Sequence, residues 1–91
     1  MKEEELHVSS LIVHVKSEQI LDLTNSIKTM SRAELVTVTE HGKAIVIIEA
    51  ANQRQIMECI DQINDIDGVV HTSLVYHEFE KSTQNNSEEI Q

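Results

Sequence analysis

Two segments with the apolar spacing of an amphipathic helix are each set between strand-like runs, and this alternation constrains the fold most strongly. Their apolar stripes recur at spacings of three and four residues. The residues of the first stripe are Ile20, Leu23, Ile27 and Met30, and those of the second are Ile56, Cys59, Ile60 and Ile63. Ser17 and Asn52 are the predicted N-caps, since their side chains accept from the open N–H groups of a first turn.

Four segments rich in Val and Ile surround these helices and are predicted to be strands, at residues 7–16, 33–39, 44–48 and 69–77. Gly42 lies in the turn between the second and third, which indicates a hairpin. The resulting order β-α-β-β-α-β is the ferredoxin-like plan. We therefore predict an α+β fold with an antiparallel sheet of strand order 4-1-3-2 and both helices on one face.

The chain has 91 residues, a length that favours one domain. We expect an acidic N-terminal extension at residues 1–6, the folded domain at 7–78 and a disordered polar tail at 79–91. The sequence shows neither the pattern of a secretory signal nor an apolar run long enough to cross a bilayer, so we expect a cytoplasmic protein. A single cysteine, Cys59, excludes an internal disulfide.

Charge and motifs narrow the possible functions. A formal net charge of −9 argues against nucleic acid or an anionic membrane surface as the partner. Cys59 lies on an apolar stripe, where a free cysteine behaves as a small buried hydrophobe. Because the sequence shows no arrangement of residues typical of a catalytic site, we expect a protein that is not an enzyme and has no cofactor.

Two near-copies, Ser10-Leu11-Ile12-Val13-His14 and Ser73-Leu74-Val75-Tyr76-His77, fall on strands that this topology makes neighbours. We expect both leucines to face the helices, and the serines and histidines to face outward on the uncovered side of the sheet. That uncovered side is predicted to bind a peptide through Ser10, Ile12, His14, Ile45, Ile47, Glu49, His71, Ser73, Val75 and His77.

This predicted surface is apolar at its centre, with short polar groups around it, as is typical of an interaction surface. Two alternatives remain: a homodimer that forms through the same face, and a regulatory module that binds a small molecule. His14, His71 and His77 could together bind zinc, but the local ligand spacing of such sites is missing, so we expect no metal site.

Four segments resemble the NapD family: Ser10-Leu11-Ile12-Val13, Lys16-Ser17-Glu18, Ile48-Glu49-Ala50 and, above all, Gly68-Val69-Val70-His71-Thr72-Ser73-Leu74-Val75-Tyr76-His77. The resemblance spans about residues 7–78 and implies a small cytoplasmic assembly chaperone with a ferredoxin-like fold. It implies that the open sheet face binds the twin-arginine signal peptide of the periplasmic nitrate reductase catalytic subunit precursor. Binding would delay export until the molybdenum cofactor is inserted.

An acidic chain with an aliphatic patch complements the arginines and the apolar stretch of such a peptide. Glu49 or Glu34 could pair with an arginine, because a guanidinium and a carboxylate form a strong, directional fork.

Overall fold

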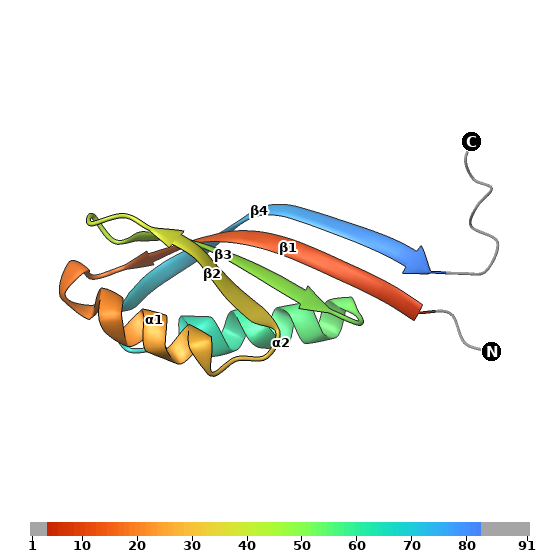
Figure 1. The fold of residues 1–91 in the computed structure, drawn as a ribbon, viewed down its shortest axis with the longest axis horizontal. Coiled ribbons are helices and arrows are strands. Elements are labelled where there is room, and N and C mark those ends of the chain that lie inside the picture. The colour runs from red at the N-terminus through yellow and green to blue at the C-terminus, as the bar shows by residue number, and fades with distance from the viewer. Residues whose placement is uncertain (1–3, 83–91) are drawn as a thin grey trace.

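The computed structural model describes the backbone of residues 4–82 and the side chains of residues 6–78. Within this range, the elements follow in the order β1 (Glu4–Val15), η1 (Ser17–Gln19), α1 (Ile20–Lys28), β2 (Ala33–Val38), β3 (Lys43–Ala50), α2 (Gln53–Asn64) and β4 (Val69–Ser82). The strands form one antiparallel sheet of order β2-β3-β1-β4, and both helices lie on the same side of it (Figure 1). The predicted fold and strand order are confirmed.

The core lies between the sheet and the helices. Alternate residues of the two central strands point into it, together with the predicted stripe of each helix. The buried apolar residues are Leu11, Val13, Val15, Leu23, Ile27, Ala44, Val46, Ile48, Ala50, Ile56, Cys59 and Ile63. Ile20, Met30 and Ile60 pack against this cluster while partly buried, so both helical stripes are confirmed.

The two predicted N-caps have different outcomes. Asn52 caps α2 as expected, because its side-chain oxygen accepts from the backbone N–H of Gln55 at 2.8 Å. The prediction for Ser17 is wrong. That residue starts the single 3₁₀ turn of η1, and its hydroxyl donates to the carbonyl oxygen of Glu40 at 3.4 Å. The short turn displaces the start of α1 to Ile20, where no side chain caps the helix.

Gly42 closes the β2–β3 hairpin in a conformation that favours glycine, with φ of 93°. Its carbonyl oxygen accepts from the N–H of Val15 at 2.8 Å, which ties the hairpin turn to the end of β1. A side chain at this position would collide with the Val15 carbonyl oxygen. The predicted glycine turn is therefore confirmed, and the close approach of β1 adds a second reason for it.

Strands β1 and β4 run further than predicted. β1 begins at Glu4 and β4 continues to Ser82, with Glu4 paired to Ser82, so part of the expected extension and tail belongs to the sheet. Each strand satisfies the backbone groups of the other even where the sequence is polar. The two strands project together beyond both helices (Figure 1). The rest of the predicted tail, residues 83–91, lies outside the described residues. No helix in residues 4–82 has the length and apolar character needed to span a bilayer.

Candidate functional site: the open face of the sheet

The side of the sheet that the helices leave uncovered is the candidate binding surface, and we call it the open face. Strand register assigns its members, since residues paired across strands share a face. They are Val8, Ser10, Ile12 and His14 of β1, Glu34 and Thr37 of β2, Lys43, Ile45, Ile47 and Glu49 of β3, and His71, Ser73, Tyr76 and Glu78 of β4.

One end of the open face is acidic. Glu49 and Glu78 flank Val8 on either side, each paired with it in the register of its own strand. Glu34 of β2 pairs with Ile47, one step along β3 from Glu49. Three carboxyl groups from three strands therefore converge on the same end of the surface. Like charges placed this closely favour a cationic partner.

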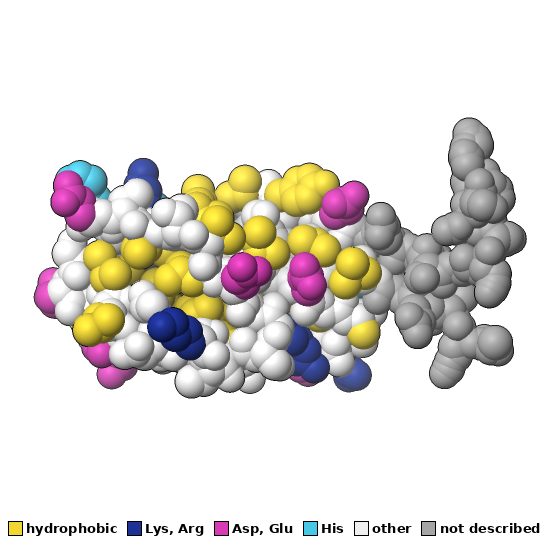
Figure 2. All heavy atoms as spheres, in the orientation of Figure 1, with side chains coloured by type: hydrophobic (Ala, Val, Ile, Leu, Met, Phe, Trp, Pro, Cys, Tyr) yellow, Lys and Arg dark blue, Asp and Glu magenta, His cyan; other side chains and the backbone are white. Residues whose placement is uncertain are grey.

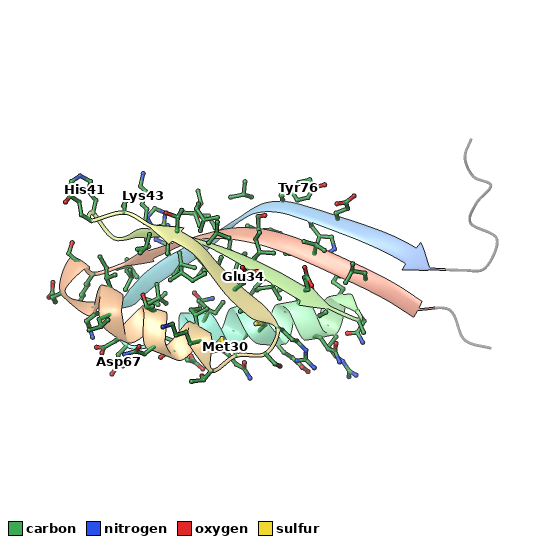
Figure 3. The ribbon with its side chains drawn as sticks, in the orientation of Figure 1. Met30, Glu34, His41, Lys43, Asp67 and Tyr76 are labelled. Atoms are coloured by element: carbon green, nitrogen blue, oxygen red, sulfur yellow. The ribbon has the colours of Figure 1, made fainter. Side chains whose placement is uncertain are left out.

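Two of these carboxyl groups are available to a partner. Glu34 and Glu49 line a hollow of about 170 Å³, whose wall also includes Arg32 and Ile47. Among the described side chains, none forms a hydrogen bond or ion pair with Glu34 or Glu49. Figure 3 shows Glu34 on β2, at the near edge of the sheet. A guanidinium group entering this corner would meet two carboxylates that no described side chain engages.

The third carboxyl group is held by an aromatic neighbour. The hydroxyl of Tyr76 donates to Oε1 of Glu78 at 3.0 Å. This hydrogen bond, the negative charge of Glu78 and desolvation together raise the pKa of Tyr76, so the phenol stays protonated as a donor. The bond fixes the ring at the boundary between the acidic end and the apolar centre.

The centre of the open face is apolar. One row across the strands contains Ile47, Ser10 and Tyr76, and the next contains Ile45, Ile12 and Ser73. Tyr76 rises from the sheet on the side away from the helices (Figure 3). Figure 2 shows hydrophobic side chains gathered along this upper side of the molecule, with acidic side chains beside them. An apolar strip that ends in carboxyl groups fits an apolar segment with cationic residues at one end.

The opposite end of the open face is basic. Lys43, His14 and His71 form one row, and the rings of the two histidines stack with centroids 4.2 Å apart and planes 20° apart. Desolvation lowers the pKa of His14, and the neighbouring His71 and Lys43 lower it further. The charge of the open face therefore changes sign along its strands.

The predicted placement of His77 is wrong, because a β-bulge interrupts the β1–β4 ladder, and the placement of Val75 on the open face stays a prediction. Ser10 pairs with Tyr76 but Leu11 pairs with Leu74, which leaves Val75 as an extra residue without a partner on β1. The extra residue reverses the alternation of every position after it. His77 consequently lies on the helix side, where its Nδ1 is 2.8 Å from the Oγ of buried Ser9.

The near-copies therefore lie side by side as predicted, but their side chains do not all point as expected. Ser10, Ser73 and His14 do lie on the open face. Leu11 is buried with 1% of its surface exposed, whereas its partner Leu74 on the edge strand is 56% exposed. The predicted members Ile12, Ile45, Ile47, Glu49 and His71 also lie on the open face.

Sequence reasoning missed Tyr76 and Glu78 as members of the open face. Simple alternation assigns them to the helix side, and no turn residue in the segment signals the bulge. Val8, Thr37 and Lys43 were also missed. The alternation of their strands would have found Val8 and Lys43, whereas Thr37 follows a register shift between β2 and β3.

Cys59 lies on the other side of the molecule, in the wall of a hollow of about 540 Å³ between the two helices. The thiol is 3% exposed, and burial raises its pKa despite the nearby charge of Arg32. A protonated, buried thiol is a poor nucleophile. Within the part of the chain that the structure describes, His, Cys, Asp and Glu side chains nowhere gather in threes as candidate metal ligands.

Comparison with known proteins agrees with this architecture. A family model described as NapD protein matches residues 6–81. Chaperone NapD of Escherichia coli (strain K12) is 33% identical over 75 residues, which cover 81% of this chain and 86% of the relative. Chaperone NapD of Haemophilus influenzae is 33% identical over 73 residues, covering 79% and 78%. The solution structure of the E. coli Tat proofreading chaperone protein NapD superposes with a TM-score of 0.74 at 30% identity, covering 88% and 85% of the two chains.

Proposed function

The chain belongs to the NapD family, whose members are chaperones and not enzymes, and from this premise we propose what its open face binds. The proposed ligand is the twin-arginine signal peptide of the precursor of the periplasmic nitrate reductase catalytic subunit. Binding takes place in the cytoplasm. The bound peptide is masked from the export machinery until the molybdenum cofactor has been inserted into the precursor, and the chaperone itself carries no cofactor.

The observation that supports this proposal is the order of charge and apolar surface along the open face. Glu34 and Glu49 stand without partners among the described residues, directly beside the apolar rows around Ile47 and Ile12. A twin-arginine signal peptide has the complementary order, two arginines followed by an apolar stretch. Each arginine can form a bidentate fork with a carboxylate, and the apolar stretch covers the isoleucines and Tyr76.

The bound peptide is masked because the chaperone covers its arginines and its apolar stretch together. A peptide that lies along the strands places its arginines and its apolar stretch against the sheet at the same time. An export receptor that needs either feature would have to displace the chaperone first. The rate of dissociation of the complex therefore sets how long the precursor is held back.

The proposal is tested by calorimetry with a synthetic twin-arginine signal peptide. Ile12→Asp places a charge in the apolar centre, and Ser73→Arg adds bulk and a repelling cation beside it. Both variants should lose measurable binding and keep the circular dichroism spectrum of the wild type. Leu21→Asp is the matched control, because Leu21 is exposed on α1, on the other side of the molecule. Unchanged affinity in both open-face variants would contradict the proposal.

Sedimentation velocity of the same proteins distinguishes the homodimer alternative. A wild-type dimer that Ile12→Asp separates, without any peptide affinity, would assign the open face to self-association. A monomer that binds the peptide in a one-to-one complex supports the chaperone proposal. A thermal shift with a metabolite and none with the peptide would instead favour a small-molecule module.

A further inference from the structure

Two pairs of histidines bridge β1 and β4, on opposite sides of the sheet. The His14–His71 pair belongs to the open face, as described above. The His7–His77 pair lies on the helix side, where the bulge places it. Nδ1 of His7 is 3.3 Å from Nε2 of His77, and the rings meet edge to face at 61° rather than stacking.

The distance between these two nitrogens matches that between two ligands of one metal ion. Zinc binds histidine nitrogen at about 2.0–2.1 Å in tetrahedral geometry. Two such bonds to nitrogens 3.3 Å apart require an N–Zn–N angle of about 104–111°, which brackets the tetrahedral angle. The same two nitrogens can share a proton in a hydrogen bond when no metal is present.

Ser9 supplies the supporting contact that metal-binding histidines usually have. Its Oγ is 2.8 Å from Nδ1 of His77, and the serine is 0% exposed, so its position is set by packing. When Nδ1–H of His77 donates to this oxygen, the lone pair of the ring is on Nε2, the atom that faces His7. A hydrogen bond from the second nitrogen is how proteins orient a histidine ligand.

We propose that His7 and His77 bind one divalent transition-metal cation of the zinc class, with His77 oriented by Ser9. His7 is buried with 7% of its surface exposed, whereas His77 is exposed and leaves an entry path from solvent. Water completes the coordination. The site is separate from the open face, so the proposal does not depend on peptide binding.

The His14–His71 pair shows why geometry, and not the mere presence of two histidines, selects the site. Its rings lie nearly parallel at 4.2 Å, so their nitrogen lone pairs do not converge on one point between them. Lys43 is in the same row and adds a positive charge that opposes a cation. This pair is the internal control that the molecule itself provides.

The test is a zinc titration of the full, untagged chain by calorimetry. The wild type should bind one Zn²⁺, and His77→Gln should abolish that binding while keeping a polar side chain. Ser9→Ala should weaken it about tenfold or more, as loss of an outer-shell partner does. His71→Gln should leave the affinity unchanged.

Thermal unfolding with and without Zn²⁺ separates loss of the site from loss of the fold. Zinc should raise the Tm of the wild type and of His71→Gln, since a ligand that binds only the folded state stabilises it. His77→Gln should unfold cooperatively without zinc and show no shift when zinc is added. Equal zinc affinity in the wild type and His77→Gln would overturn the proposal and leave a simple hydrogen bond between the histidines. Equal losses in His71→Gln and His77→Gln would also overturn it.

Discussion

The two ladders that β1 forms with its neighbours differ in regularity. The ladder with β3 runs without a break from the pair His7–Ala50 to the pair His14–Lys43. The ladder with β4 shifts register twice, and one of those shifts leaves Val75 without a partner. In the regular ladder, alternation along the sequence alone assigns each side chain to a face. In the bulged ladder only the tertiary pairing does, and its strand β4 contributes four of the fourteen members of the open face.

Deleting one residue from each ladder should give the largest difference in stability between them. Removal of Ile47 from β3 reverses the alternation that buries Ile48 and Ala50, so we expect loss of cooperative folding. Removal of Val75 takes away only the extra residue of the bulge and leaves every cross-strand pair in place. We expect its free energy of unfolding to stay within about 1 kcal/mol of the wild type.

Urea denaturation followed by circular dichroism measures both deletions. If Val75 were part of a regular strand, its removal would turn Tyr76 and His77 to the wrong faces and unfold the domain as well. Such an outcome would rule out the bulge and return His77 to the open face.

The directly paired residues Leu11 and Leu74 should differ in how much each side chain contributes to the free energy of unfolding. Leu11→Ala removes a buried side chain from the regular core and should lower the free energy of unfolding by about 2–5 kcal/mol. Leu74→Ala changes an exposed residue and should cost about 0.5 kcal/mol or less. Thermal or urea unfolding gives both values. Equal losses would show that Leu74 is covered in solution, by a second copy or by another partner.

The smallest expected effect concerns pH and the His14–His71 pair. Because the pKa of His14 in the folded chain lies below its ordinary value of 6.5, the unfolded chain binds more protons in this range. His14 therefore favours folding above about pH 6.5, and this contribution is lost as pH falls through that value toward the lowered pKa.

The measurement is the free energy of unfolding of wild type and His14→Gln between pH 8 and pH 5. The wild type should lose more stability than the variant as pH falls. Comparing the two proteins subtracts the contribution that the shared histidines make to the pH dependence. A larger loss in His14→Gln would show that His14 gains a partner on protonation, contrary to its place beside Lys43.

Much of the fold follows from local patterns. The stripe of α2 and the cap at Asn52 are consequences of helix geometry, and the hairpin at Gly42 follows from the conformational freedom of glycine. The start of α1 did not follow, because the hydroxyl of Ser17 donates to Glu40, a residue distant in sequence, instead of capping the helix. The far ends of β1 and β4 also depend on pairing between distant segments, which polar residues alone do not reveal.

The sequence by itself determined the order of the elements, the buried stripe of each helix and the faces of the regular ladder. These features depend on the helix period of 3.6 residues and the strand period of 2 residues, which are visible in the sequence. The tertiary structure alone decided the outcome of the two near-copies. A single extra residue at Val75 places Tyr76 on the open face and His77 beside Ser9, because a side chain in a bulged strand takes its face from the partner strand.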